Sequence, residues 1–249
     1  ITNLFSAIPV VGDAILLTLL GDFTVSDATV NRFYVLHWLL AFAIVGLVVF
    51  HVITLHMTGS NNPSGMEPQN WDETLSFHPY MTIKDTKAMV LFFILVAFVL
   101  FFFPNIMGHS DNYIRANSMV TPAHIVPEWY FLPFYAILRA IPDKLGGVLA
   151  MFGSIAVLFL LPWLDTSKVR SCLYRPIWRI CVLLFALDFF ILMYMGAKPA
   201  SDIYVLISRI GTAYWFLFFL VLAPLVGYLE TPRQPLTISN FLRDKKSLI

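Results

Sequence analysis

Two histidines place the strongest constraint on this sequence, because they lie fourteen residues apart in a segment that is otherwise apolar. Residues 33–50 carry no charged side chain, and only apolar residues and Gly46 separate His37 from His51. A helix of that length crosses the hydrocarbon core of a membrane. Fourteen helical residues return to within roughly 40° of the starting direction and rise about 21 Å. We therefore expect both imidazoles on one helix face at two depths, where each could ligate the iron of a separate haem.

Two other interpretations of the same pattern stay open. A single buried histidine is usually a core residue with hydrogen-bonded ring nitrogens, so His37 or His51 taken alone favours a structural role. A transporter could instead combine membrane histidines with the intramembrane acid Asp188 in a proton relay. Such a relay does not require two imidazoles on one face, so their spacing favours an electron path.

The composition is that of an integral membrane protein. Hydrophobic residues make up 59% of the 249 residues and charged residues 12%, about half of the charged fraction usual in a soluble domain. The net charge of +1 gives no basis for nucleic-acid binding. Five apolar segments predict membrane spans at residues 32–57, 88–103, 145–164, 177–195 and 210–229. We therefore predict an all-α integral membrane protein, with further surface helices in the N-terminal stretch and in the long connection at residues 105–144.

Basic residues predict which ends of the spans face the cytoplasm or its mitochondrial equivalent. The loops at residues 58–87 and 165–179 and the C-terminal tail share one side and hold ten of the sixteen Lys and Arg residues. The positive-inside rule makes that side the inner one. We divide the chain into residues 1–57, with surface helices and the histidine helix, and residues 58–249, with the longer loops and a C-terminal four-helix membrane region.

Several motifs together resemble one known family. They are the two histidines, Ser-Phe-His-Pro-Tyr at 76–80 before Lys84 and Asp85, Gly-His-Ser-Asp-Asn-Tyr at 108–113, and Pro-Glu-Trp-Tyr at 127–130 followed by Phe-Leu-Pro-Phe-Tyr-Ala-Ile-Leu-Arg at 131–139. The chain resembles cytochrome b of ubiquinol:cytochrome c oxidoreductase, respiratory complex III. The resemblance covers nearly the whole chain and corresponds to the second half of that protein. The histidine spacing is that of the mitochondrial and purple-bacterial forms, whereas the chloroplast relative has one more residue between the histidines.

The resemblance implies two haem b groups. His37 would be an axial ligand of the low-potential haem near the outer face, and His51 of the high-potential haem near the inner face. The family holds each haem between two histidines, and the second ligands belong to an earlier helix in an N-terminal half that we expect as a partner. Arg32 would pair with a haem propionate; its alternative role is an arginine that snorkels to the membrane interface.

The outer quinol-oxidation site is expected around Glu128. A carboxylate among aromatic residues is partly desolvated, which raises its pKa and suits it to accept a proton from a hydroquinone. The alternative is an interfacial carboxylate hydrogen-bonded to backbone. The resemblance implies that Tyr135 and residues 1–11 line this pocket and that Asp143 and Lys144 lie where the mobile iron-sulfur protein docks.

The inner quinone-reduction site is expected around His56. This residue is five positions beyond His51 and so is turned about 140° from the haem face. The resemblance implies that His56, Ser60, Lys84 and Asp85 surround the quinone that is reduced. The alternative for His56 is a solvent-facing helix end.

The resulting functional prediction is a membrane subunit that oxidises hydroquinone outside, carries electrons through two haems and reduces quinone inside, with proton translocation. The implied partners are a Rieske iron-sulfur protein, a cytochrome c1-type subunit, the lipid bilayer and a second copy of the complex. We expect no activity from the isolated chain, and a location in a bacterial cell membrane or the mitochondrial inner membrane. The alternative is a non-redox membrane scaffold of that complex.

We expect structural roles for His78, His109 and His124, and we expect Cys172 and Cys181 to be small buried residues.

Overall fold

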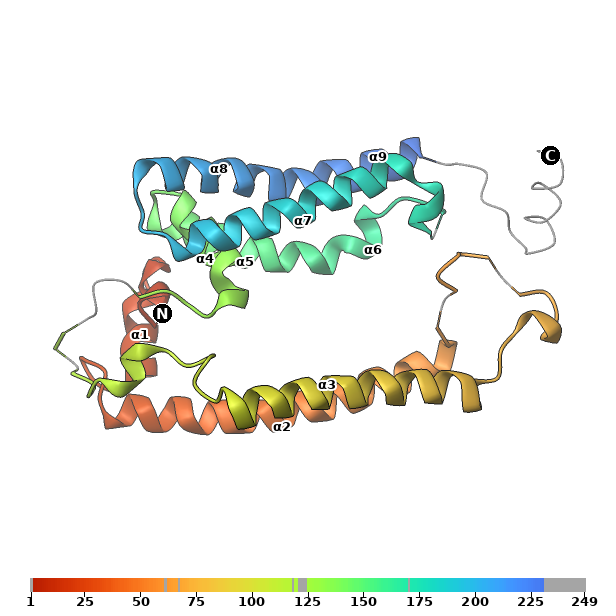
Figure 1. The fold of residues 1–249 in the computed structure, drawn as a ribbon. Helices are drawn as coiled ribbons and strands as arrows, with labels where there is room; N and C mark the ends of the chain where they lie inside the picture. The colour runs from red at the N-terminus through yellow and green to blue at the C-terminus, as the bar shows by residue number, and fades with distance from the viewer. Residues whose placement is uncertain are drawn as a thin grey trace. The chain divides into compact units, whose positions relative to one another are not determined.

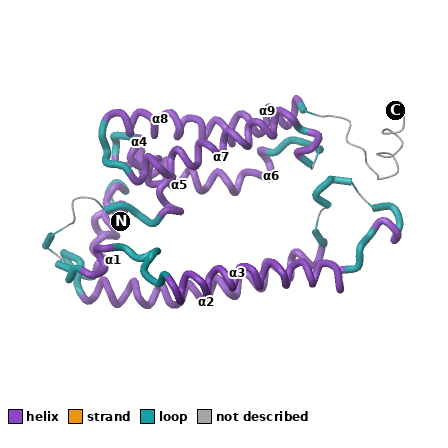
Figure 2. Tube along the Cα trace, viewed as in Figure 1, coloured by secondary structure: helices purple, strands orange, loops and turns teal. Residues whose placement is uncertain are grey.

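The computed structural model describes residues 2–60, 62–66, 68–117, 119–120, 125–169 and 171–230. These residues form helices and connecting turns without a β-strand (Figures 1 and 2). The α-helices are α1 (Gly12–Leu20), α2 (Asp27–Thr58), α3 (Thr82–Phe102), α4 (Leu132–Ala140), α5 (Lys144–Ala156), α6 (Leu161–Leu164), α7 (Pro176–Ala197), α8 (Asp202–Leu217) and α9 (Ala223–Leu229). The shorter 3-10 or π-helical turns are η1 (Thr2–Ala7), η2 (Trp71–Glu73), η3 (Phe77–Met81), η4 (Ser110–Tyr113), η5 (Trp129–Phe131), η6 (Val157–Leu160), η7 (Cys172–Tyr174) and η8 (Phe218–Leu222).

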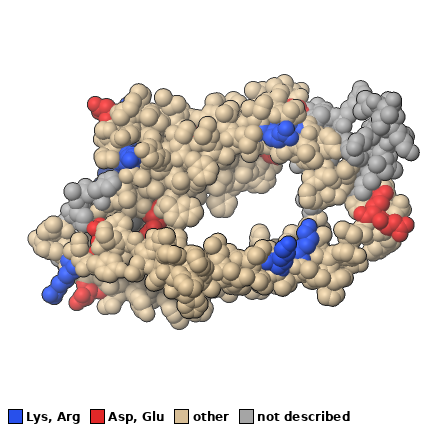
Figure 3. Space-filling view, in the orientation of Figure 1, with Lys and Arg blue, Asp and Glu red and all other residues tan. Residues whose placement is uncertain are grey.

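Among the described residues, five helical segments are long and apolar enough to cross a membrane, which confirms the predicted fold class. They are Asp27–Thr58, Trp71–Phe102, Lys144–Leu164, Pro176–Ala197 and Asp202–Leu229. On the face drawn in Figure 3, charged side chains gather near the ends of the long helices and leave the lengths between them uncharged. The helices η1, α1, η5 and α4 lie in the two stretches where additional helices were predicted.

Two predicted span boundaries were wrong. We placed residues 58–87 in a loop, but α3 begins at Thr82, so Lys84, Asp85 and Lys87 lie in its first two turns. Asp85 is compatible with a helix start because a carboxylate in the first turn interacts favourably with the positive end of the helix dipole. The helix of the fifth span likewise begins at an acidic residue, Asp202, rather than at residue 210.

Helix α2 is continuous over its 32 residues and extends about 48 Å. Its start is tied to α1, because the Thr29 hydroxyl donates to the Leu20 carbonyl at 2.6 Å and accepts from the Ser26 N–H at 3.2 Å. It ends at Gly59, whose φ of 77° lies in the region that favours glycine. None of its most apolar window is buried against the described chain. The histidine helix therefore presents a continuous exposed surface.

The chain divides into two compact units: residues 1–65 with 121–234, and residues 66–120 with 235–249. The core of the first unit lies where α4 packs against α7 and α8. Gly196 of α7 permits this close approach, because a Cβ at that position would collide with the carbonyl oxygen of Leu132. Three turns nearer the beginning of α7, on the same face, Phe185 stacks on Phe218 of η8 with ring centroids 4.3 Å apart. Helix α4, which follows the Pro-Glu-Trp-Tyr motif, is thus placed by two spanning helices.

A buried carboxylate from a distant part of the chain caps the beginning of α7. Glu230, directly after α9, accepts hydrogen bonds from the backbone N–H groups of Ile177 at 2.6 Å and Trp178 at 3.0 Å. The first N–H groups of a helix have no partner within it, so this acceptor satisfies two of them. The contact also joins the end of the fifth span to the start of the fourth.

The two cysteines differ in exposure. Cys181 is buried in α7, as predicted, whereas Cys172 is exposed, so the prediction for Cys172 was wrong. Cys172 lies in the short turn η7, before the α7 span begins. The acid Asp188 is buried in α7, and one of its carboxylate oxygens has no hydrogen-bond partner among the described residues.

Candidate functional site

The two candidate haem ligands lie on one unbroken helix. His37 and His51 both belong to α2 and both are exposed. Ile44 and Val48, which helical geometry places on the same face between them, are exposed as well. Among the described residues, no group of three or more His, Cys, Asp or Glu side chains could hold a metal ion. The two imidazoles on one face, with exposed apolar side chains between them, are compatible with one axial ligand for each of two haems, and this role stays a prediction.

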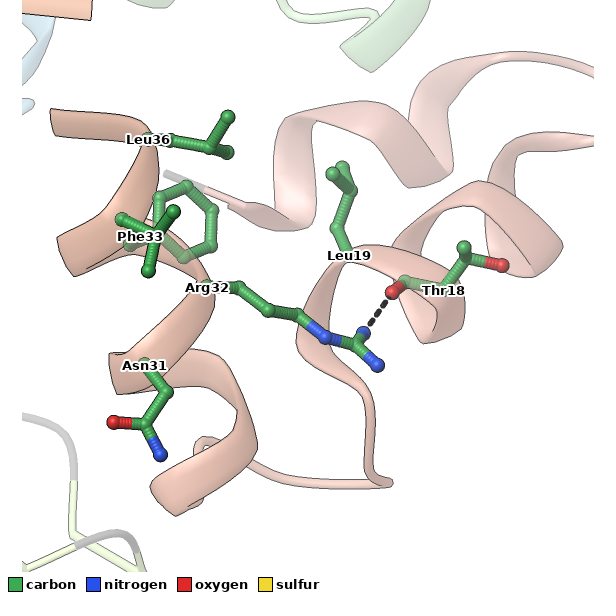
Figure 4. Close-up of a pocket in the computed structure, with 7 residues that line it drawn as sticks. Thr18, Leu19, Asn31, Arg32, Phe33 and Leu36 are labelled. Atoms are coloured by element: carbon green, nitrogen blue, oxygen red, sulfur yellow. Dashed lines mark hydrogen bonds between the residues drawn. The ribbon is translucent and has the colours of Figure 1, made fainter. Parts of the chain in front are cut away.

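Arg32 contacts the end of α1. Its guanidinium donates a hydrogen bond to the carbonyl of Thr18, in the last turn of α1, inside an open groove (Figure 4). Gly21 leaves room for this contact, because a Cβ there would lie 2.6 Å from the guanidinium carbon. Arg32 precedes His37 by five residues and so points about 140° away from the imidazole face. The structure thus shows Arg32 capping a helix end, and its pairing with a propionate stays a prediction.

Glu128 is exposed, and its aromatic neighbours do not enclose it. The rings of Trp129 and Tyr130 meet edge to face with centroids 5.6 Å apart, and both rings are more than half exposed. The backbone carbonyl of Glu128 accepts from the Phe131 N–H at 2.9 Å, which begins the helix that continues into α4. The described part of the chain therefore does not supply the desolvation that we expected for this carboxylate.

Tyr135 lies one turn into α4, on the segment that continues from Glu128. Its hydroxyl donates to the Ile125 carbonyl at 3.4 Å, a long hydrogen bond. Its ring is covered by the guanidinium of Arg139, whose central carbon lies 4.6 Å from the ring centroid. Sequence reasoning gave Arg139 no role of its own, although its position four residues after Tyr135 on a helix places the two side chains next to each other.

The N-terminal stretch that was expected to line the outer pocket contacts the start of α5. The Lys144 ammonium donates to the Ser6 hydroxyl at 2.5 Å. Asp143 caps α5, because its carboxylate accepts from the Gly146 N–H at 2.6 Å. The structure therefore brings η1 and the two expected docking residues together in one unit.

The four residues of the expected inner site belong to two units of the chain. His56 and Ser60 lie exposed at the end of α2, in the first unit. Lys84 and Asp85 lie exposed in the first turns of α3, in the second unit. Each pair is at a helix end, which is where polar groups remain accessible beside a membrane.

Two of the remaining histidines have local partners. His78 Nδ1 lies 2.9 Å from the Thr82 hydroxyl, and His109 Nδ1 accepts from the Asp111 N–H at 3.2 Å. These contacts fit the structural roles that we expected. His124 lies outside the described residues.

Comparison with known proteins gives the same family along most of the chain. A family model described as cytochrome b(N-terminal)/b6/petB matches residues 1–110, and one described as cytochrome b(C-terminal)/b6/petD matches residues 115–216. Cytochrome b of Rickettsia prowazekii is 57% identical over 232 residues, which cover 93% of this chain and 58% of that protein. The chain belongs to the cytochrome b family. Cytochrome b of Rhodospirillum rubrum is 55% identical over 241 residues, covering 96% of this chain and 60% of that protein.

A solved structure supports the same assignment. A chain of a hyperthermophilic respiratory Complex III superposes with a TM-score of 0.82 at 31% identity, covering 90% of this chain and 58% of that chain. This cytochrome b family chain thus spans less than two thirds of the length of the relatives that it matches. With five helices long and apolar enough to cross a membrane among its described residues, it is an integral membrane protein.

Proposed function

We propose that this chain is the haem- and quinone-binding membrane part of a quinol:cytochrome c oxidoreductase. The observation that carries the proposal is the pair His37 and His51 on one exposed, unbroken helix in a member of the cytochrome b family. Bound at these two imidazoles, haem b would supply one-electron transfer between the two faces of the membrane. The chain itself holds the two ligands about 21 Å apart along the helix and keeps charged side chains away from the surface between them.

At the outer site, Glu128 would accept a proton from hydroquinone while a Rieske partner takes one electron. Its exposure leaves the carboxylate free to reach a bound ligand. Tyr135 forms a wall of the same pocket, and the contact between Lys144 and Ser6 places the expected docking residues beside η1. A carboxylate at this position gives the proton a defined route away from the substrate.

At the inner side, His56 and Ser60 would bind the quinone that is reduced, together with Lys84 and Asp85. Imidazole, hydroxyl and ammonium groups donate hydrogen bonds to quinone oxygens, and a carboxylate can take up a proton and pass it on to the reduced quinone. His56 is available for this role because it is turned about 140° from His51 on the same helix. His37 lies toward the beginning of α2 and His56 near its end, so electron transfer between the two proposed sites would separate charge across the membrane.

Partners are required to cover the exposed apolar helices. The most apolar windows of α2 and α3 bury none of their residues against the described chain. Lipid, haem and other helices, including those that carry the second axial histidines, would cover these surfaces. We propose a Rieske protein, a cytochrome c1-type subunit and a second copy of the complex as the protein partners.

Reduced-minus-oxidised visible spectra of the assembled complex test the function directly. His51→Leu should remove the inner haem and stop quinone reduction, while the outer site still delivers one electron to the iron-sulfur partner. His37→Leu should remove the other haem and stop electrons before they reach the inner side. His56→Leu is the matched control for haem content, because this histidine lies on the same helix but off the ligand face. Retention of both haem signals in the His37 and His51 variants would contradict the proposal.

A further inference from the structure

We propose that Arg139 is a positioning residue for Tyr135: anchored on the end of α7, its guanidinium holds the phenol ring in the orientation that the outer quinol pocket requires. This inference rests on the proposed function, because it concerns the same pocket. It goes further by assigning the orientation of the pocket wall to a residue that lies outside the Pro-Glu-Trp-Tyr motif.

The guanidinium of Arg139 is fixed by three backbone carbonyls. Nη1 donates to the Lys198 carbonyl at 2.8 Å, and Nη2 donates to those of Met195 at 2.8 Å and Gly196 at 3.2 Å. These carbonyls belong to the last turn of α7 and to its C-cap residue Lys198, at the negative end of the helix dipole. The planar group forks between the carbonyls, so its plane and its position are both defined.

The ring of Tyr135 takes its orientation from this fixed group. The central carbon of the guanidinium lies 4.6 Å from the ring centroid, which is cation–π distance. Both residues are partly buried on α4, one turn apart. The tip of the ring reaches the Ile125 carbonyl, three residues before Glu128. Tyr135 is thus held from its face by Arg139 and at its hydroxyl by the segment that carries the candidate proton acceptor.

Preorganisation of the ring should appear in substrate binding. A pocket wall that is already in place does not lose side-chain freedom when the ligand binds, whereas a free tyrosine does. Without Arg139 the ring would have to be ordered by the quinol itself. The expected loss is therefore in KM for quinol, with less effect on kcat.

If Arg139 only stabilised the helix packing, its replacement would have a different effect, and Arg209 provides the matched comparison. Arg209 of α8 donates from Nε to the Ala140 carbonyl at 2.8 Å, so it also caps a helix end, that of α4, in the same bundle. Among the described residues it covers no aromatic ring. If capping were the whole effect, the two arginines would behave alike when replaced.

The experiment measures KM for quinol, kcat and haem content in membranes that contain the assembled oxidoreductase. We expect Arg139→Gln to raise KM roughly two- to thirtyfold, the range that corresponds to a lost cation–π contact. Arg209→Gln should leave KM unchanged. In a Tyr135→Leu background, Arg139→Gln should add no further rise in KM, because the ring through which it acts is gone.

Arg139→Lys keeps the charge at the end of α7 but cannot fork between the carbonyls, so it should assemble and still raise KM. Equal KM values for the Arg139→Gln and Arg209→Gln enzymes would overturn the proposal. A wild-type KM in the Arg139→Lys enzyme would also overturn it, and this variant decides the matter if Arg139→Gln fails to assemble. Additive effects of Arg139→Gln and Tyr135→Leu on KM would overturn the proposal as well. A wild-type complex that does not oxidise quinol would instead refute the proposed function, whatever Arg139 does.

Discussion

The exposed carboxylate of Glu128 shows that this residue does not by itself define the surroundings of the proposed outer site. Its neighbours Trp129, Tyr130 and Phe131 are half exposed, so they do not enclose the carboxylate. A carboxylate that is to accept a proton efficiently has to be shielded from bulk water while it reacts. For Glu128 this shielding would come from the bound quinol and from neighbouring subunits.

Replacing Glu128 with Gln tests its role as proton acceptor. The amide keeps nearly the same shape but cannot be protonated, so quinol oxidation should fall by about a hundredfold to ten-thousandfold, with haem content unchanged. The carboxylate must be ionised to accept a proton, so wild-type turnover should decline toward acid pH as it becomes protonated. The variant should lack that decline in a pH profile of quinol oxidation.

The comparison with the wild-type profile decides the role of Glu128. If the acid limb of the profile survives in the Gln variant, another group accepts the proton and Glu128 is only part of the pocket wall. Tyr130→Phe is a useful control, because it alters the same turn without removing a carboxylate.

At the level of whole helices, hydropathy and periodicity predicted most of the fold. The five spans and the continuous histidine helix followed from long apolar runs, whose signal is local. The residues at which the helices begin and end were not predicted correctly from these runs. Lys84 and Asp85 lie in α3 because polar first turns are compatible with a helix yet look like a loop in a hydropathy profile. Contacts between distant residues, such as Glu230 with Ile177 and Arg139 with Met195, have no repeating sequence pattern at all.

The close approach of α7 and α8 gives a prediction about Gly211. A Cβ at this position would lie 2.8 Å from Oδ1 of the buried Asp188 and 2.8 Å from Leu192. Gly211→Ala should therefore force the two helices apart and destabilise the protein by about 1–3 kcal/mol. The measurement is the midpoint of thermal loss of the haem spectrum in the assembled complex.

Gly153 of α5 is the matched control for this substitution. A Cβ there would meet only Phe216, at an ordinary 3.8 Å. Gly153→Ala should be neutral or slightly stabilising, because alanine favours a helix over glycine. Equal midpoints for the two alanine variants would show that the contact between Gly211 and Asp188 does not limit helix packing.

For the molecule as a whole, the main physical constraint is that the two axial ligands of each proposed haem would be divided between this chain and a partner. Each haem in the proposed complex needs two imidazoles, and α2 would supply one at each depth. His78 and His109 have their own partners in other segments, and His56 is turned away from the ligand face. The unburied surfaces of α2 and α3 show the same need for neighbours, since the most apolar windows of both helices are exposed in the described chain.

The polypeptide of residues 1–249, expressed without a partner, should therefore lack the low-spin spectrum of haem b ligated by two imidazoles. The spectrum should appear when a segment carrying the second pair of histidines is co-expressed, and it should then require both His37 and His51. Haem-stained native gels and reduced-minus-oxidised spectra of the purified species provide the measurement. A stable two-haem spectrum from the polypeptide alone would mean that this chain finds both axial ligands within itself, and the assignment of one imidazole per iron would be wrong.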